Sequence, residues 1–268
     1  MRPIHGLAVF AHAAWLGFKQ TVSERLILFG TFLVYAAIIL AYSSVFRAID
    51  ASSLAAYKLT QANLIWYMGL TELVLFCMPS FQYRLLQQEI RSGDIDLLLV
   101  RPCPFWIVKL GDGTGQFCAR LLALSLPCLA LTGAVAGEAF PGTGRMLGAL
   151  LCAGLAGPLL TASYFMLGAS CMWLRQAEPA FWIWQKSMFL LGGLLWPLAL
   201  YPSAVRHLAW LTPFPALLAV SAQWSLPGGG WWLAAGVLHQ VFWGAAIVFA
   251  MARVNRALMR AIQEGKGA

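Results

Sequence analysis

The chain is poor in charge: of its 268 residues, 18 are Lys or Arg and 10 are Asp or Glu, whereas 60% are hydrophobic. A soluble domain needs roughly a quarter of its residues charged to cover its surface. A mean hydropathy of +0.74 excludes that class of protein. The composition therefore predicts an integral membrane protein.

Other absences narrow the function. The sequence contains no G-x-x-x-x-G-K-[ST] motif, so it offers no backbone cradle for nucleotide phosphates, and we expect any ATP hydrolysis on another polypeptide. The GDGTG at 111–115 lacks the Lys and Ser/Thr of that motif, and we interpret it as a flexible boundary before a membrane span. The six cysteines form no CxxC pair and the four histidines are scattered, so we expect no disulfide, no metal site and no catalytic residues.

Long apolar runs predict the fold class, an all-α integral membrane protein with six transmembrane helices. A helix rises about 1.5 Å per residue and needs about 20 apolar residues to cross the hydrocarbon core. A run such as LILFGTFLVYAAIILAY is apolar on every side, unlike the alternating strands of a membrane barrel. The six runs cover residues 26–42, 64–81, 115–135, 146–174, 181–200 and 231–252.

The distribution of Lys and Arg predicts the orientation. With six spans both termini lie on one side, which would hold 13 of the 18 Lys and Arg residues, and Arg120 lies inside the third span. The opposite side would hold four: Arg47, Lys58, Arg145 and Arg206. Short loops rich in Lys and Arg are retained in the cytoplasm, so both termini are predicted to be cytoplasmic. We assign the net charge of +8 to contact with anionic membrane lipid rather than with nucleic acid.

The regions that flank the spans have patterns of their own. In residues 1–25, apolar side chains recur at helical spacing, which predicts an amphipathic interfacial helix along the cytoplasmic leaflet. This segment is too polar for a signal peptide, and a cytoplasmic extension of the first span is the alternative. Residues 26–252 would form the transmembrane domain, and residues 253–268 a basic cytoplasmic tail.

The stretch 201–230 is too apolar for a plain loop. Prolines divide it into pieces too short to cross the bilayer, which predicts re-entrant or interfacial half-helices on the extracytoplasmic side. The prolines that mark these half-helices are Pro202, Pro213 and Pro215.

A charged segment, EIRSGDIDLLLVRP at 89–102, separates the second and third predicted spans within a cytoplasmic loop at 82–112. Ahead of it the spacing predicts a helix with an apolar face of Tyr83, Leu86 and Ile90 and a polar face of Arg84, Gln88 and Arg91. Gly93 is expected to end this helix in the left-handed conformation. Asp94 would then cap a second short helix that Pro102 terminates. The apolar DLLLV favours binding of a partner or of the chain's own membrane domain over a solvated loop.

Three charged residues fall inside predicted spans: Glu72, Lys186 and Arg120, of which Arg120 is expected to reach the headgroups by snorkelling. Glu72 lies near the middle of the second span, where a charge costs at least about 2.5 kcal/mol. It could line a polar route, pair with a basic group on a neighbouring helix, or be protonated and hydrogen-bonded. Lys186 in the fifth span shares the first two options, and its long side chain also reaches the headgroups by snorkelling beside Trp182 and Trp184.

The motif IRSGDIDLLLVRP, placed between the second span and a third that begins GTGQFCARLLALSLP, resembles the ABC-2 type permeases. Within them it is similar to a six-span subgroup often encoded as a pair of permeases beside an ATPase. LYPSAVRHLAWLTPFPALLAVSAQW is similar to the segment of this family between spans five and six. The resemblance implies a type V exporter-like fold and the permease half of an ATP-binding cassette exporter in the bacterial cytoplasmic (inner) membrane.

The resemblance also implies partners and roles. The helix before Gly93 would be a coupling helix that seats in a groove of an ATPase subunit, two copies of which would hold the ATP and Mg. A second permease would complete the translocation path, and the resemblance to paired permeases favours a heterodimer over a homodimer. Glu72 and Lys186 would line this path or form ion pairs within the membrane. The residues assigned to ATPase coupling are Arg84, Gln88, Glu89, Arg91, Gly93, Asp94, Arg101 and Pro102. A lipid-modifying membrane enzyme and a secondary transporter are the alternative functions.

Overall fold

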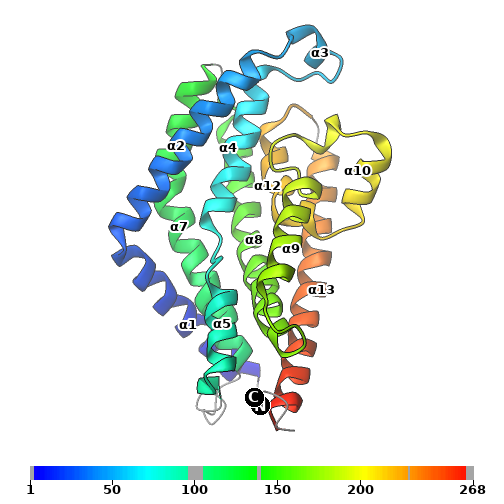
Figure 1. Ribbon diagram of the computed structural model, residues 1–268. Coiled ribbons are helices and arrows are strands. Elements are labelled where there is room, and N and C mark those ends of the chain that lie inside the picture. The colour runs from blue at the N-terminus through cyan, green and yellow to red at the C-terminus, as the bar shows by residue number, and fades with distance from the viewer. Residues whose placement is uncertain (1–2, 96–104, 138–139, 229, 264–268) are drawn as a thin grey trace.

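The computed structural model describes residues 3–95, 105–137, 140–228 and 230–263. These residues form helices and connecting turns, with no strand among them. Long helices stand side by side, and the start of α1 and the end of α13 lie at the same end of the molecule (Figure 1). The predicted all-helical class is confirmed.

Five helical stretches are long and apolar enough to cross a membrane. The most apolar part of each stretch has a high mean hydropathy, as expected for a segment in contact with lipid. A helix suits this environment because it satisfies its own backbone hydrogen bonds. They are α2 (Arg25–Arg47), α4 (Gln61–Cys77) followed by α5 (Gln82–Arg91), α7 (Phe105–Ala136), α8 (Thr143–Ala169) and α13 (Gly230–Gln263).

Shorter elements connect and flank these helices. α1 precedes α2, α3 joins α2 to α4, and the remaining short helices lie between α8 and α13. The α-helices among them are α1 (Pro3–Ser23), α3 (Ala51–Ala55), α9 (Glu178–Leu191), α10 (Ser203–Trp210), α11 (Phe214–Leu217) and α12 (Ala219–Ala222). The 3₁₀ helices are η1 (Ser170–Met172), η2 (Leu198–Leu200) and η3 (Gln223–Ser225).

The prediction of six continuous spans was wrong at the fifth, residues 181–200. This stretch is occupied by α9, which has 14 residues and ends before Gly192 and Gly193, the latter at φ 67°. Fourteen residues cover about 21 Å, less than the roughly 30 Å of hydrocarbon. The chain continues without a regular helix to η2, although α9 still carries it from the end that holds α5 toward the end that holds α10 (Figure 1).

The break after α9 is held by side chains of α4. The Tyr67 hydroxyl donates to the Gly193 carbonyl at 2.8 Å, and the Thr71 hydroxyl donates to the Leu194 carbonyl at 2.6 Å. Irregular backbone is tolerated at membrane depth where protein surrounds it and satisfies its polar groups. The two hydroxyls therefore stabilise a non-helical turn beside the middle of α4.

The interpretation of GDGTG as a flexible boundary was also wrong, because these residues lie inside α7. Gly111, Gly113 and Gly115 are buried, and α1 crosses α7 over them. A Cβ on Gly115 would lie 1.9 Å from the Ala14 carbonyl oxygen, and one on Gly111 would lie 2.6 Å from the Phe10 carbonyl oxygen. Small residues let helix backbones approach closely, which is the main source of helix association in lipid.

The predicted division of the chain differs in detail from the helices. α1 ends at Ser23, and α13 continues through residue 253 to Gln263, so the start of the predicted basic tail is an extension of the last long helix. Residues 105–112 of the predicted cytoplasmic loop belong to α7. α4 lies at the centre of the bundle, where Tyr67, Leu70 and Leu73 are fully buried.

Candidate partner-binding surface at alpha5

A short break separates α5 from α4. α4 ends at Cys77, Pro79 follows, and α5 begins at Gln82. Proline cannot donate a backbone hydrogen bond, so the helix cannot continue unchanged through this position. The Arg120 guanidinium of α7 donates to the carbonyl of Met78, in the break between the two helices, at 2.8 Å. Arg120 therefore satisfies the end of α4 and fixes the direction in which α5 leaves.

The apolar face of α5 packs on the bundle. Tyr83, Leu86 and Ile90 are buried, which confirms the face predicted from their spacing. The Tyr83 ring stacks on Phe181 of α9, with centroids 4.2 Å apart. On α8, a Cβ at Gly168 would lie 2.8 Å from the Tyr83 carbonyl oxygen, so α5 sits close to that backbone. These contacts make α5 a fixed part of the membrane domain.

The opposite face of α5 and the turn after it are exposed. Gly93 has φ 77°, which confirms the predicted left-handed end of the helix. Asp94 begins the next helical segment and accepts a hydrogen bond from the Ser92 hydroxyl at 2.6 Å. The exposed polar residues of this surface, named here the α5 surface, are Arg84, Gln88, Arg91, Ser92, Gly93 and Asp94.

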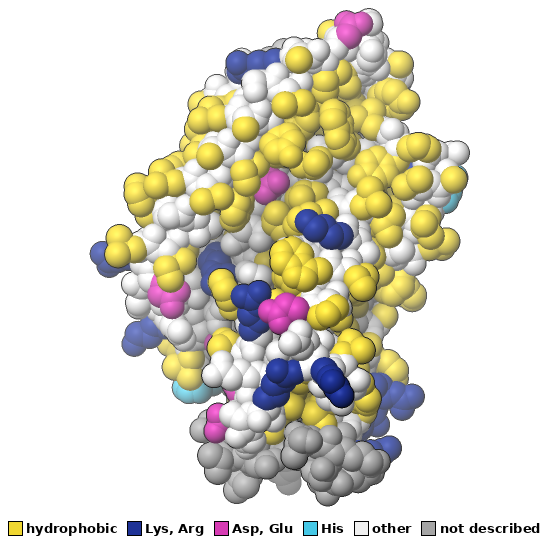
Figure 2. Space-filling view, in the orientation of Figure 1, with side chains coloured by type: hydrophobic (Ala, Val, Ile, Leu, Met, Phe, Trp, Pro, Cys, Tyr) yellow, Lys and Arg dark blue, Asp and Glu magenta, His cyan; other side chains and the backbone are white. Residues whose placement is uncertain are grey.

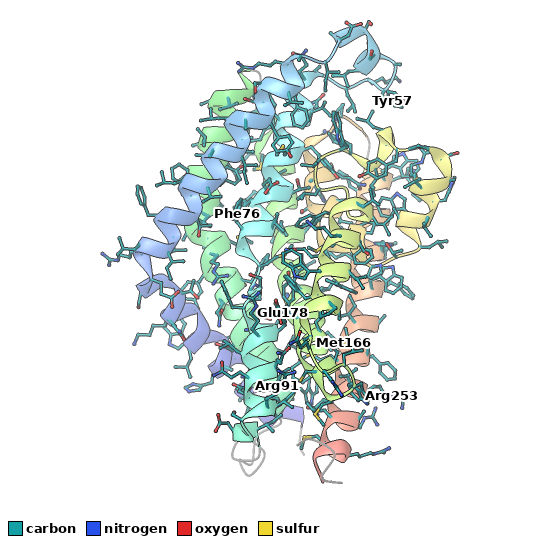
Figure 3. All side chains as sticks on the ribbon, in the orientation of Figure 1. Tyr57, Phe76, Arg91, Met166, Glu178 and Arg253 are labelled. Atoms are coloured by element: carbon teal, nitrogen blue, oxygen red, sulfur yellow. The ribbon has the colours of Figure 1, made fainter. Side chains whose placement is uncertain are left out.

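Four polar contacts tie α5 to its neighbours, one of which is the hydrogen bond that the Gln82 amide donates to Asp112 Oδ2 of α7 at 3.4 Å. Glu89 pairs with Lys109 of α7 at 2.5 Å, and Arg84 pairs with Glu178 of α9 at 3.2 Å. The side-chain oxygen of Gln87 accepts the backbone N–H of Ala177 at 2.8 Å. The labelled Arg91 and Glu178 lie in the lower half of the molecule (Figure 3). α5 is therefore connected to α7, to the residue preceding α9 and to α9 itself.

These contacts divide the predicted coupling residues. Gln88 and Arg91 are exposed, and Arg84 is exposed while it forms an ion pair with Glu178 of α9. Glu89 instead faces Lys109 inside the protein and is not part of the exposed face. Arg101 and Pro102, together with most of the predicted second helix, lie outside the described residues.

The partners Lys109, Gln87 and Glu178 were missed by the sequence reasoning. Two of them carry a charge opposite to that of a residue in the predicted loop, so charge complementarity was the available signal. Sequence alone gave no register between the segments, and many alternative pairings fit the same charges.

The intramembrane charges Glu72 and Lys186 are placed differently. Glu72 on α4 is 3% exposed, and its Oε2 has no hydrogen-bond partner among the described residues. Lys186 is exposed on α9, with its ammonium 5.6 Å from the Trp182 ring centroid and 5.5 Å from that of Phe189. The described part of the chain shows no ion pair for either residue, so intramembrane pairing gains no support there.

The proline-rich stretch lies at the end of the molecule opposite α5 (Figure 1). Pro202 directly precedes α10, Pro213 directly precedes α11, and Pro215 occupies the first turn of α11. These are positions where proline fits a helix, because the first turn has no backbone acceptor for its N–H. Short helices thus form here, and their location on the extracytoplasmic side stays a prediction.

Charged side chains are distributed unevenly between the end of the molecule that holds α5 and the end that holds the proline-rich stretch. Hydrophobic side chains cover the upper and middle parts of the face seen in Figure 2, and charged side chains gather in its lower part. Within the described ranges no group of three or more His, Cys, Asp or Glu side chains is placed to hold a metal ion. What the lower end presents is a basic, exposed helix face on a rigid helical base, which suits contact with a protein partner.

A bundle of helices long and apolar enough to cross a membrane defines an integral membrane protein of the multi-pass class. Comparison with protein families gives the particular family: residues 32–258 match the ABC-2 family transporter protein. The match covers most of the chain, so the protein belongs to this family. It is a multi-pass membrane permease component of an ABC transporter, and the family implies association with an ABC ATPase. No match was found among curated proteins.

Proposed function

We propose that the protein is the permease of an ATP-driven exporter and that the α5 surface is its contact with the partner ATPase. The observation that carries the proposal is the two-sided construction of α5. One face is buried against α8 and α9 through Tyr83, Leu86 and Ile90, while Gln88 and Arg91 on the other face are exposed. A helix that is fixed on one side and polar on the other transmits a push from a partner to the bundle.

The contacts of α5 support the transmission of movement. A displacement of the ATPase would act first on Arg91 and Gln88. It would then reach α7 through the Glu89–Lys109 pair and α9 through the Arg84–Glu178 pair. The Arg84–Glu178 pair is solvent-exposed and contributes little stability, so it can re-form during a movement, whereas the Glu89–Lys109 pair is partly buried. The rigid element is the apolar face of α5, and the ion pairs guide it.

In the proposed cycle, ATP and Mg are bound by two ATPase subunits on the cytoplasmic side of the bacterial inner membrane. Their closure would move α5 and open a path between two permease protomers. A heterodimer with a second permease is proposed, because the sequence resembles permeases encoded in pairs. Both termini would then be cytoplasmic, in agreement with the basic residues on the side that holds α5.

The test is co-purification of the tagged chain with the ATPase from its native membrane, followed by an ATPase assay. Arg91→Glu reverses an exposed charge on the proposed contact and leaves the buried face untouched. We expect it to reduce ATPase recovery about tenfold or more, because a like-charge contact at an interface costs several kcal/mol. Rising salt should weaken the wild-type complex as well.

Arg253→Glu is the matched control. Arg253 is an exposed arginine of α13, and it is labelled in the lower half of the same view as Arg91 (Figure 3). The same charge reversal there should leave ATPase recovery unchanged. Equal losses in both variants would mean that bulk charge and not the α5 surface controls association. Unchanged recovery in Arg91→Glu would remove the assignment of α5 as the contact.

The heterodimer is tested by expressing two differently tagged copies of the chain together with the second permease. Recovery of the second permease, without the other tagged copy, is the expected result. Recovery of both tagged copies in one complex would replace the heterodimer by a homodimer and would leave the ATPase contact standing.

A further inference from the structure

A cavity of about 760 Å³ is lined in part by α10, a helix that lies at the end of the molecule opposite α5 (Figure 1). One wall is formed by η2 and α10, a second by η3 and the turn at 226–228, and a third by the first part of α13. The volume is within the range of about 300–1,000 Å³ that is typical of small-molecule sites. The cavity is separate from the α5 surface and plays no part in the proposed ATPase contact.

The walls are held together by specific contacts. The imidazole of His239 on α13 lies 3.1 Å from the Trp210 carbonyl of α10, and the two rings meet edge to face with centroids 5.0 Å apart. Arg145 of α8 donates to the carbonyls of Leu226 and Gly228 at 2.6 and 2.9 Å, which fixes the turn between η3 and α13. The cavity is therefore a built feature of three connected walls.

The lining is cationic on one side and apolar on the other. Arg206 and His207 of α10 and His239 of α13 contribute the positive or protonatable groups, and none of the described residues that line the cavity is acidic. The sequence contains no Asp or Glu between Glu178 and Glu264. Within the described part of the chain, the Arg206 guanidinium has neither an ion-pair partner nor a hydrogen bond.

Aromatic and aliphatic side chains complete the lining. Trp210 comes from the α10 wall and Trp232 from the α13 wall, and Leu198, Leu226 and Leu233 also line the cavity. A single polar amide, that of Gln223, is placed among them and lies close to Gly236 of α13. A site with one cationic edge and an aromatic, aliphatic interior is complementary to a molecule with an anionic head and an apolar body.

We propose that this cavity binds an anionic amphiphile, with its head at Arg206 and its apolar part between Trp210 and Trp232. Arginine is suited to this contact because its guanidinium donates two parallel hydrogen bonds to an oxyanion. The occupant is either an anionic membrane lipid or a non-lipid amphiphile of the same chemistry. The tryptophans supply large contact area at low cost in conformational entropy.

The test uses the full-length protein in phosphatidylcholine nanodiscs and a long-chain alkyl sulfonate that carries a diazirine and an alkyne. Matched probes have the same chain with a trimethylammonium or a hydroxyl head. After photolysis, labelled peptides are quantified by mass spectrometry. We expect the sulfonate to label the cavity walls, in 198–210 and 230–239, at least about five times more than the trimethylammonium probe.

Arg206→Gln removes the charge and keeps a polar side chain of similar reach. It should lower sulfonate labelling about tenfold, as expected for loss of a charge-assisted hydrogen bond, and leave labelling by the hydroxyl probe unchanged. Lys58→Gln removes an exposed cation from the turn after α3, at the same end of the molecule, and should have no effect.

Gly236→Leu fills the cavity without changing its charge. A Cβ at this position makes ordinary contact, 3.4 Å from Val220 Cγ1, so α13 has room for it. This variant should lower labelling by the sulfonate and hydroxyl probes together. Equal labelling by the sulfonate and trimethylammonium probes, or equal behaviour of the Arg206 and Lys58 variants, would overturn the proposal, as would unchanged labelling of Gly236→Leu.

A second arm identifies the source of the occupant. Nanodiscs that contain phosphatidylglycerol present an anionic lipid to the same cavity. Loss of sulfonate labelling in these nanodiscs supports the proposal with a membrane lipid as the occupant. Labelling that persists with phosphatidylglycerol, but is competed by soluble alkyl sulfonate, supports it with a non-lipid amphiphile as the occupant.

Discussion

The crossing of α1 over α7 provides the sharpest stability prediction. Gly115 faces the backbone of α1, and a Cβ there would lie 1.9 Å from the Ala14 carbonyl oxygen. An ordinary carbon–oxygen contact is about 3.4 Å. Gly115→Ala therefore requires the two helices to separate by about 1.5 Å, and the obstacle is backbone rather than a side chain that could rotate away.

The expected cost follows from this geometry. Overpacking of a tight contact costs about 1–3 kcal/mol, and the upper part of that range applies where backbone must move. Alanine is intrinsically better than glycine in a helix by up to about 1 kcal/mol, which opposes the effect without reversing it. At about 2–4 °C per kcal/mol, we expect the melting temperature to fall by about 5 °C.

The assay is thermal melting of the detergent-purified protein, followed by size-exclusion chromatography of the remaining monodisperse fraction. Gly154→Ala is the matched control, because Gly154 lies in α8 and a Cβ there meets nothing within 4 Å. That variant should melt at the wild-type temperature or slightly above it. If Gly115→Ala melted together with Gly154→Ala, α1 would not cross α7 at this position and the reasoning would be refuted.

Two further substitutions test contacts inside the bundle. Tyr67→Phe removes the hydroxyl that donates to the Gly193 carbonyl at 2.8 Å. It should lower the free energy of unfolding by about 1–3 kcal/mol, measured by the same melting assay. A melting temperature equal to that of the wild type would show that the turn after α9 does not need this hydrogen bond. Glu72→Gln should leave the melting temperature unchanged or raise it, because Glu72 Oε2 is buried without a hydrogen-bond partner among the described residues and an amide costs less to bury than a carboxylate. A lower melting temperature for Glu72→Gln would instead indicate a partner for the carboxylate in the assembled transporter.

Much of the helical framework could be predicted from the sequence because hydrocarbon imposes a simple requirement. A segment that is apolar on all sides over about 20 residues must be a helix, since every backbone group needs an internal partner. For this reason the first, third and sixth predicted runs fall within α2, α7 and α13, respectively. The fourth run begins within α8, and its last few residues extend past α8 into η1 and the turn after it. α5 was predictable from a different signal, the helical spacing of Tyr83, Leu86 and Ile90 outside the apolar run.

The break in the fifth run escaped prediction because hydropathy does not register backbone conformation. FLLGGLLWPLAL is apolar throughout, and its mean hydropathy is the same whether it is helical or not. The local signal was present in Gly192, Gly193 and Pro197, which disfavour a continuous helix. What stabilises the break lies far away in sequence, in Tyr67 and Thr71 of α4, and no pattern within the run reveals them.

The glycines of α7 were misread for a related reason. Glycine in a soluble loop indicates conformational freedom, whereas glycine at every fourth position of a membrane helix indicates close packing. The spacing of Gly111 and Gly115 carried the second meaning, but it could be recognised only by taking α7 to begin well before the apolar run. Within the described residues α7 runs from Phe105, and its early residues Phe105 and Leu110 are buried against the protein, so this part of the helix needs no long apolar stretch.

The broken helix also connects the two functional proposals. α9 begins at Glu178, which pairs with Arg84 of the α5 surface, and the irregular turn after it leads to Leu198 in the wall of the cavity. A continuous helix of 20 residues would carry a displacement from one end to the other as a rigid rod. A helix that ends after 14 residues does not, because the turn at 192–197 absorbs part of the movement by changes in φ and ψ. The hydrogen bonds from Tyr67 and Thr71 set the resistance of that turn. In the proposed cycle, α4 would therefore control, through these two side chains, how far a push on α5 reaches the opposite end.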